Sequence, residues 1–395
     1  MKRHFKFLHI SDLHIGSRHP LCPPGESTEK RELFYGLSLK GLQRAVDLTN
    51  RESLDALLIA GDLVESSTLD YRVLDDVFRI LAGCKAPVII VPGNHDLYQN
   101  VYKRAKLDFY GIRVPENLFI FSSPSFTSFR IKGVNIYGMA NTTPDVKPFN
   151  GLPVLNREEI NIASFHGSLL SFLPPGKEPW LPFSSEDVID AGFDYIALGH
   201  YHSYREIKDS EGIVRAAYSG SLMPTNRTET DRRGGLIVKI ERKDGLSTVD
   251  LDFVQLAPFS VRTLKLSITE EHSIEEIKGM ILSELPQTER VNTYLIIRAS
   301  GTGASLLERA KEEIAEGFLH IELDTSGMFS ENMDSLLSSY NPESLTGRFV
   351  KAIKEEMVSA EPLSRIILRN ALLYGLDALR GREIEPRYET EKIQG

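Results

Sequence analysis

Five short apolar runs in the first 205 residues are each followed directly by a cluster of Asp, Asn or His side chains. The runs are bounded by Gly, Pro, Asp or Ser, which indicates buried strands. Residues just past the carboxyl ends of strands gather in one crevice of an α/β sheet. The pattern therefore predicts an α/β fold in which the five clusters meet. The runs are residues 5–10, 55–60, 87–91, 161–165 and 194–198.

Side chains suited to binding metal ions dominate these clusters. Carboxylate and imidazole groups suit Mn, Fe and Zn ions, and no cysteine joins them, which excludes a thiolate zinc finger. Asp62 is the central candidate, because an aspartate carboxylate can bridge two cations. Glycines before Asp62, Asn94 and His200 let the chain turn sharply at the strand ends. The clusters are Asp12-Leu13-His14, Gly61-Asp62, Gly93-Asn94-His95-Asp96, His166-Gly167 and Gly199-His200-Tyr201-His202.

The segments around the clusters complete the first domain. Residues 31–50 and 69–82 have the pattern of amphipathic helices. From residue 203 the chain changes to short strands separated by turns, such as Asp244-Gly245. Together these elements predict two packed sheets flanked by helices. The later strands are expected at 204–207, 214–218, 235–240 and 248–254.

Pro258 marks a domain boundary, after which the pattern predicts a small α/β domain. Ser273 and Glu276 there form a capping box that opens a helix. Beyond it the chain is helical, and two apolar helices at 345–357 and 363–379 either pack on the main domain or accept a partner helix. The predicted domains are 1–257, 258–326 and 327–395.

Composition sets looser bounds on location and partners. The two cysteines, Cys22 and Cys84, do not make a disulfide framework, which favours a reducing cytoplasm. No apolar run approaches the roughly 20 residues that a membrane helix needs, so we expect no membrane association. The formal net charge of -9 argues against a broad basic surface for nucleic acid. A negative net charge is still compatible with a local basic surface beside an acidic metal site.

The five clusters resemble the signature of the calcineurin-like metallophosphoesterase superfamily over roughly residues 5–255. Residues 7–16 and Ser219-Gly220-Ser221 are most similar to its SbcD-like and YhaO-like DNA-repair exonuclease branch. The resemblance implies an α/β (α+β) fold, a four-layer αββα sandwich of two mixed sheets flanked by helices. It also implies a small α/β capping domain and a helical C-terminal segment that binds an ATPase partner.

The same resemblance implies a ligand set for two divalent cations, Mn first, with Fe, Zn or Mg as alternatives. His95 would stand over the scissile phosphate and protonate the leaving oxygen after a hydroxide held between the cations attacks. Asp96 either orients His95 or caps the following segment. One metal would be held by Asp12, His14, Asp62 and His202, and the other by Asp62, Asn94, His166 and His200.

Substrate contacts are expected from Arg18, Glu65 and Arg227 near these loops. Glu65 departs from the nuclease branch, which commonly has a histidine three residues after the bridging aspartate. That histidine is thought to position a DNA end, so the departure puts the exonuclease mode in question. Further basic residues near the clusters either contact phosphates or are solvated surface charges; they are Lys103, Arg104, Arg232 and Arg233.

Three functions remain open on the sequence. The first is a DNA exonuclease or endonuclease of double-strand-break repair, acting with an SMC-like coiled-coil ATPase (SbcC-like), and a homodimer is compatible with it. The second is a phosphatase or phosphodiesterase acting on a small nucleotide or other phosphoester. The third is a scaffold subunit without activity, against which the complete ligand set argues. The long segment after Pro258 favours the first.

Overall fold

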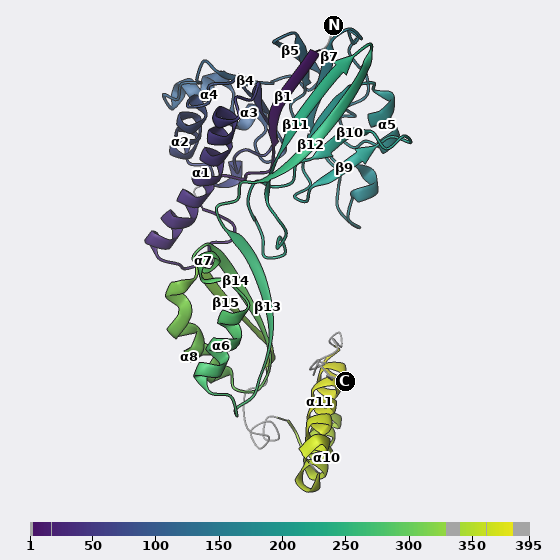
Figure 1. The fold of residues 1–395 in the computed structure, drawn as a ribbon. Coiled ribbons are helices and arrows are strands. Elements are labelled where there is room, and N and C mark those ends of the chain that lie inside the picture. Colours follow the sequence, from purple (N-terminus) through teal and green to yellow (C-terminus); the bar gives the residue numbers. More distant parts are fainter. Residues whose placement is uncertain (1–2, 17, 329–339, 361, 382–395) are drawn as a thin grey trace. The chain divides into compact units, whose positions relative to one another are not determined.

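The computed structural model describes residues 3–16, 18–328, 340–360 and 362–381. The remainder of the predicted helical C-terminal segment lies outside the described residues. The chain forms two compact units, Met1–Val261 and Arg262–Gly395, each of which is considered by itself below (Figure 1). Among the described residues, no helix has both the length and the apolar character that a membrane crossing requires.

Six strands form the first sheet of the N-terminal unit, sheet I. Its central strands β1 to β4 run parallel, and the β11–β12 hairpin extends it antiparallel beside β1. The alignment of Ile10 with Ile59, and of Ala60 with Val91, brings the carboxyl ends of β1, β2 and β3 to one edge. In sheet order the strands are β12 (Leu246–Gln255), β11 (Gly234–Lys243), β1 (Arg3–Ile10), β2 (Ala56–Ala60), β3 (Val88–Val91) and β4 (Leu118–Ile120).

Another six strands form sheet II. Strands β6, β7, β8 and β10 are parallel, and β5 and β9 are antiparallel edges. His166 at the end of β7 pairs with Gly199 at the end of β8. In sheet order the strands are β5 (Thr127–Ile131), β6 (Val134–Gly138), β7 (Ile160–His166), β8 (Tyr195–Gly199), β10 (Val214–Tyr218) and β9 (Arg205–Lys208).

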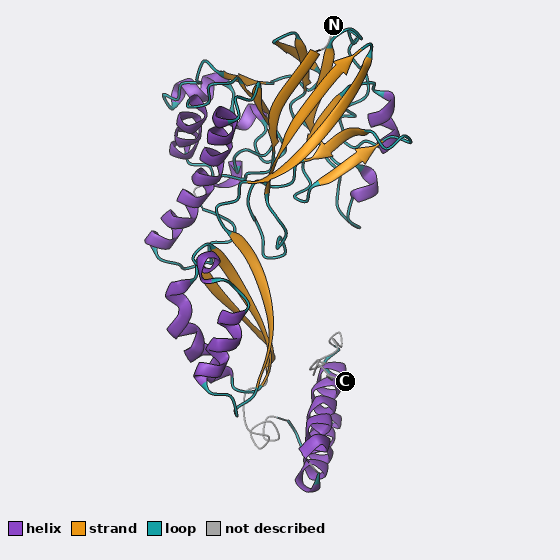
Figure 2. Cartoon of the chain, viewed as in Figure 1, coloured by secondary structure: helices purple, strands orange, loops and turns teal. Residues whose placement is uncertain are grey.

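The two sheets pack face to face around a shared apolar core, with residues such as Phe7, Leu58, Ile162 and Ala197 contributed by both. Helices cover the outer faces: Figure 2 shows α1 and α2 on one side of the strands and α5 on the other. The predicted αββα sandwich of two mixed sheets is thus confirmed. The helices and 3-10 turns of this unit are α1 (Thr28–Arg51), η1 (Ser66–Thr68), α2 (Tyr71–Ala82), α3 (Tyr98–Val101), α4 (Arg104–Phe109), η2 (Leu170–Phe172) and α5 (Ser185–Asp190).

Side-chain caps explain where the main helices begin. Ser27 accepts a hydrogen bond from the Lys30 amide at the start of α1, and Asp70 accepts one from Arg72 at the start of α2. The amphipathic α2 buries one apolar stripe, including Val73.

The C-terminal unit contains a three-stranded sheet with its own apolar core and a separate helix pair. Helices α6 and α8 pack on the sheet through residues such as Ile281, Leu307 and Ile297, and the predicted capping box of Ser273 and Glu276 opens α6. Helices α10 and α11 pack on each other. The elements are β13 (Ser260–Ile268), α6 (Ile274–Ser283), α7 (Gln287–Arg290), β14 (Thr293–Gly301), α8 (Ala304–Ile314), η3 (Ala315–Gly317), β15 (His320–Met328), α10 (Leu345–Ser359) and α11 (Pro362–Leu379).

Candidate metal centre

All five predicted clusters lie at the carboxyl ends of strands. Asp12 and His14 follow β1, Asp62 follows β2, and Asn94 follows β3 in sheet I. His166 ends β7, and His200 and His202 follow β8 in sheet II. The centre is therefore built where the same ends of the two packed sheets meet.

Backbone strain accompanies this convergence. Four of the predicted ligands have the positive φ values that usually require glycine. Hydrogen bonds between neighbouring loops hold this conformation, with the amides of Asp12 and His14 donating to the carbonyls of Gly61 and Asp62 at 3.1 and 3.0 Å. The strained residues are Asp12 (53°), His14 (48°), Asp62 (52°) and His200 (116°).

Two glycines let the loops approach this closely. A Cβ on Gly93 would lie 2.2 Å from Oδ1 of Asp62, and one on Gly61 would lie 2.2 Å from Nδ1 of His166. Gly61 also has a φ of +92°. Glycine before Asp62 thus has both a steric and a conformational reason, and glycine before Asn94 has a steric one.

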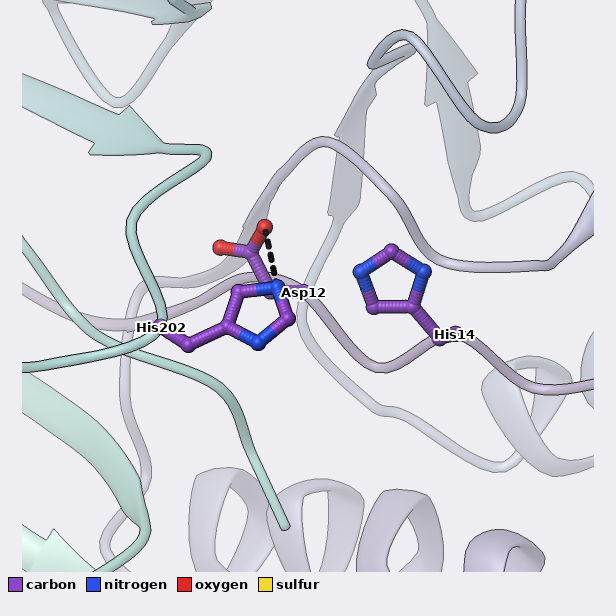
Figure 3. Close-up of side chains that lie close together, drawn as sticks. All are labelled: Asp12, His14 and His202. Atoms are coloured by element: carbon purple, nitrogen blue, oxygen red, sulfur yellow. Dashed lines mark ion pairs between the residues drawn. The ribbon is translucent and has the colours of Figure 1, made fainter. Parts of the chain in front are cut away.

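Asp62 lies between histidines from both sheets. Its Oδ2 atom is 3.1 Å from Nε2 of His166 and 3.7 Å from Nε2 of His14. On the other side of His14, Oδ1 of Asp12 is 3.8 Å from Nε2 of His202, the pair joined by a dashed line in Figure 3. Carboxylate oxygens and imidazole nitrogens of Asp12, His14 and His202, and of Asp12, Asp62 and His166, thus lie close enough together to hold a metal ion.

Asn94 and His200 face each other beside His166. Oδ1 of Asn94 lies 3.2 Å from Nδ1 of His200, and the rings of His166 and His200 have centroids 5.2 Å apart. The amide of His200 donates to the carboxylate of Asp12 at 3.1 Å. All seven predicted ligands are therefore brought together around Asp12 and Asp62.

The electrostatics of the centre favour the ionised form of Asp62. Burial alone would raise the pKa of Asp62, but the neighbouring imidazoles, His166 above all, hold it well below its usual range. Burial also lowers the pKa of His166, yet the carboxylates of Asp62 and Asp12 outweigh this effect and raise it to about 9. Burial, reinforced by His166, lowers the pKa of His200 to about 4.

Unsatisfied ring nitrogens indicate that the centre fits cations. Within the described part of the chain, Nε2 of His14 and Nε2 of His166 are buried and make no hydrogen bond. Buried polar atoms are normally satisfied, and both of these nitrogens face carboxylate oxygens instead. A divalent ion with nitrogen and oxygen ligands would satisfy them.

The side chain of His95 is half-exposed beside the ligands, and its partner is Glu65. Nδ1 of His95 lies 2.7 Å from Oε2 of Glu65, and the same oxygen is 3.4 Å from Nδ1 of His14. Glu65 was predicted to contact substrate. The structure adds a contact that the sequence did not suggest, in which Glu65 orients His95.

Asp96 makes contacts that neither of its two predicted roles describes. Its buried carboxylate accepts hydrogen bonds from the amides of Asp62, Leu63 and Gly93 and from the hydroxyl of Tyr102, at 2.6 to 3.1 Å. It therefore ties the two loops of the centre together. The following helix α3 begins at Tyr98, and its N-cap residue Leu97 makes no side-chain hydrogen bond.

The predicted basic contacts differ in exposure. Arg18 and Arg227 are exposed, and Arg18 donates to the Cys22 carbonyl at 3.3 Å; their contact with substrate stays a prediction. Arg233 is only 3% exposed, so the expectation of a surface charge is wrong for it. Its guanidinium donates to the carbonyl of His202 and to Ser221, which makes it an internal support of the loop that carries His202.

Comparison with known proteins places this fold and site in a family. The sequence profile of the calcineurin-like phosphoesterases matches residues 5–204. The chain belongs to the calcineurin-like phosphoesterase family. As a family member with clustered ligand side chains at the expected place, it is a metal-dependent phosphoesterase.

Its relatives include proteins of the predicted branch. The metallophosphoesterase YhaO of Bacillus subtilis is 25% identical over 334 residues, 79% of this chain and 76% of that protein. The DNA double-strand break repair protein Mre11 of Methanosarcina acetivorans is 26% identical over 327 residues, 79% of this chain but only 48% of that protein. A solved dimetal phosphatase from Danio rerio covers 62% of this chain and 98% of its own, at 14% identity and a TM-score of 0.39.

Proposed function

We propose that this phosphoesterase is a two-metal phosphodiesterase, with Mn²⁺ as the preferred ion and DNA as the substrate. The observation that carries the proposal is the position of Asp62, whose Oδ2 atom lies 3.1 Å from His166 and 3.7 Å from His14. A carboxylate between two groups of imidazoles can serve two adjacent cations at once.

The ligands divide into two sites that share Asp62. We name them site A, formed by Asp12, His14, Asp62 and His202, and site B, formed by Asp62, Asn94, His166 and His200. Two bound cations would activate a water molecule as the nucleophile and neutralise charge that develops on the phosphate. The protein contributes fixed positions, because strained loops and interlocking hydrogen bonds hold the ligands in place before any ion arrives.

His95 is the proton donor in this proposal. Its side chain is 44% exposed beside the ligands, so a substrate phosphate can reach it. Nδ1 of His95 donates a hydrogen bond to Oε2 of Glu65, which leaves Nε2 as the nitrogen available to a substrate. A protonated ring there would give its proton to the departing sugar oxygen.

DNA is favoured as the substrate by the relatives and by the second unit. Several curated relatives are named DNA double-strand break repair protein Mre11, and the family match itself ends at residue 204. The proposal includes a role in DNA repair with an SMC-like ATPase that binds the α10–α11 pair. Exposed Arg18 and Arg227 would contact phosphates, an interaction that weakens with added salt.

A small phosphoester is the second candidate, and a cavity beside the centre favours it. The cavity measures about 500 Å³ and is lined by His200, His202, Tyr201, Phe172 and Arg205. That is enough room for a single nucleotide, and the net charge of -9 suits a small substrate better than a long polyanion.

A substrate panel tests both candidates. The purified full chain with Mn²⁺ is given an end-labelled hairpin DNA, an overhang duplex, mononucleotides and bis(p-nitrophenyl) phosphate, with the Asp62→Asn variant as the inactive control. The DNA proposal expects labelled fragments that the control does not produce. Hydrolysis of the small esters without any DNA cleavage would transfer the assignment to the second candidate, and no hydrolysis by metal-loaded protein would contradict both.

A further inference from the structure

Glu229 is a buried acid beside the metal centre to which neither the sequence pattern nor the proposed mechanism gives a role. It lies in the loop between β10 and β11 and is 5% exposed. Burying a carboxylate costs free energy unless the group is hydrogen-bonded, and the carboxylate of Glu229 accepts several hydrogen bonds. Its oxygens accept from the Thr225 amide at 2.8 Å, the Thr225 hydroxyl at 3.0 Å, the Asn226 amide at 2.5 Å and the Ser221 hydroxyl at 3.3 Å.

The remaining partner of this carboxylate is His202. Nδ1 of His202 lies 2.7 Å from Oε1 of Glu229. An ionised carboxylate can only accept, so the hydrogen of the ring sits on Nδ1. The lone pair is then on Nε2, which faces Asp12 at 3.8 Å. Glu229 thus selects the tautomer whose free nitrogen points into site A, as the rings in Figure 3 are arranged.

The backbone of His202 is held from the same loop. Arg233, four residues after Glu229, donates through its guanidinium to the His202 carbonyl, and the Ser221 amide donates to that carbonyl at 2.9 Å. One short loop therefore fixes both the main chain and the ring of a single histidine. A packing role alone would not require the carboxylate of Glu229 to hydrogen-bond to the ring nitrogen of His202.

Among the described residues, the Nδ1 atoms of the site B histidines meet neutral acceptors, with Oδ1 of Asn94 at 3.2 Å from His200. Nδ1 of His166 is 2.9 Å from the carbonyl of Ala60, a neutral acceptor. A carboxylate behind a ligating imidazole increases its basicity, and loss of such a partner typically lowers metal affinity 10–100-fold. Glu229 is placed to have this effect on site A.

We propose that Glu229 is a positioning residue for site A, holding His202 in the tautomer and orientation that bind a divalent cation. This inference rests on the proposed two-metal function. Glu229 lines the cavity beside the centre, but it is only 5% exposed and its carboxylate is taken up by His202 and the donors of its own loop. Its loss therefore weakens the binding of one cation and leaves the other site and the proton donor His95 in place.

Calorimetric titration of Mn²⁺ into chelator-stripped full-length protein tests the inference without any activity measurement. For Glu229→Gln, which keeps the volume of the side chain but not its charge, we expect one of two binding events to weaken about 10–100-fold. Glu159→Gln is the matched control. Glu159 is a similarly buried glutamate, 8% exposed, but it precedes β7 at the end opposite His166, so both binding events should be unchanged.

A double-mutant cycle separates positioning from general destabilisation. In a His202→Ala background, Glu229→Gln should have no further effect on Mn²⁺ affinity, while phosphodiesterase activity of the single variant should recover at high Mn²⁺. If Glu229→Gln does not fold, as judged by circular dichroism, Asn226→Ala removes a donor to the same carboxylate and should weaken the same binding event.

The outcomes distinguish this inference from the function on which it rests. Wild-type protein that binds no Mn²⁺ overturns the two-metal proposal itself. Wild-type protein that binds two ions with an affinity that Glu229→Gln does not change overturns the role of Glu229 alone. The role of Glu229 is also overturned if Glu229→Gln still weakens Mn²⁺ binding in the His202→Ala background, because the effect would then act through another residue.

Discussion

Oε2 of Glu65 lies 2.7 Å from Nδ1 of His95, so an acid from the β2 loop and the proposed proton donor from the β3 loop form a hydrogen-bonded pair. Glu65 is itself fixed, since Oε1 accepts from the amide and hydroxyl of Ser67 at 3.2 and 2.7 Å. The exonuclease branch commonly has a histidine at this position, and a histidine could not supply the same negative charge. In this chain, therefore, the residue three positions after Asp62 places a negative charge next to His95, which a histidine at that position would not do.

Replacing Glu65 with Gln should shift the pH dependence of turnover. The hydrogen bond to Glu65 raises the pKa of His95, with Asp62 adding to the effect. A general acid must be protonated, so activity is lost as pH rises through that pKa. In Glu65→Gln the raised pKa falls, and the alkaline limb of the kcat profile should move to lower pH, with kcat near pH 8 down roughly tenfold.

Because Glu65 also lies 3.4 Å from Nδ1 of His14, the bound metal of Glu65→Gln must be measured beside its kinetics. Profiles at saturating Mn²⁺ isolate the effect on His95. An alkaline limb that coincides with that of wild type would show that Glu65 does not act through the proton donor.

Replacing His95 with Asn should lower kcat most for substrates whose leaving group must be protonated. General acids contribute about 10²–10⁴-fold, so kcat on a dinucleotide, whose sugar oxygen leaves poorly as an anion, should fall by that range. The fall on bis(p-nitrophenyl) phosphate should be much smaller, because nitrophenolate leaves without a proton. Metal content by elemental analysis should stay at the wild-type level. Equal losses on both substrates would contradict the proton-donor role.

Much of the fold and the grouping of the ligands could be predicted because both follow from strand ends. Apolar runs such as 55–60 and 194–198 became β2 and β8, and parallel strands bring their carboxyl ends to one edge. The β5–β6 hairpin was missed. Its turn residues Lys132 and Gly133 have φ values of 49° and 79°, so the Lys-Gly pair between alternating apolar residues was an available signal.

The supporting residues could not be predicted, because their partners are distant in sequence or depend on local loop paths. Glu229 is 27 residues from His202, and nothing in its neighbourhood differs from a surface turn. Asp96 was predicted to orient His95 or to cap the following segment, but the chain bends at residues 94–96 and the Asp96 carboxylate accepts from the amides of Gly93 and Asp62. A sequence pattern can therefore predict which residues bind metal, but it does not predict which buried acids hydrogen-bond to those residues.

Replacing Asp96 with Asn should lower the free energy of unfolding of metal-free protein by about 2–4 kcal/mol. The amides of Asp62, Leu63 and Gly93 point at this carboxylate, and an Asn side chain has one acceptor oxygen and adds donors of its own. Tyr102→Phe removes a single donor to the same group and should cost about 1 kcal/mol. Urea denaturation in the presence of chelator measures both. An Asp96→Asn variant as stable as wild type would mean that the hydrogen bonds to the Asp96 carboxylate do not stabilise the loops that contain Asp62 and Gly93.

Binding of Mn²⁺ at site B should release a proton from His166 but none from His200. The pKa of His166 is raised to about 9 because Asp62 and Asp12 outweigh its burial, so the metal-free ring is protonated at pH 7 and a cation must displace that proton. The pKa of His200 is lowered to about 4, mainly by burial, so its ring is already neutral. Apparent affinity should therefore increase up to about tenfold per pH unit between pH 7 and 9.

Calorimetry in buffers of different ionisation enthalpy counts the protons released per ion bound. Wild type and His200→Ala should both release the proton of His166 at pH 7, whereas His166→Ala should release about one fewer. The two variants each lose one imidazole ligand of site B, so they differ in protonation and not in the number of ligands removed. Equal proton release by both would mean that Asp62 and Asp12 do not hold the proton on His166, and that the raised pKa is not what sets the pH dependence of metal binding.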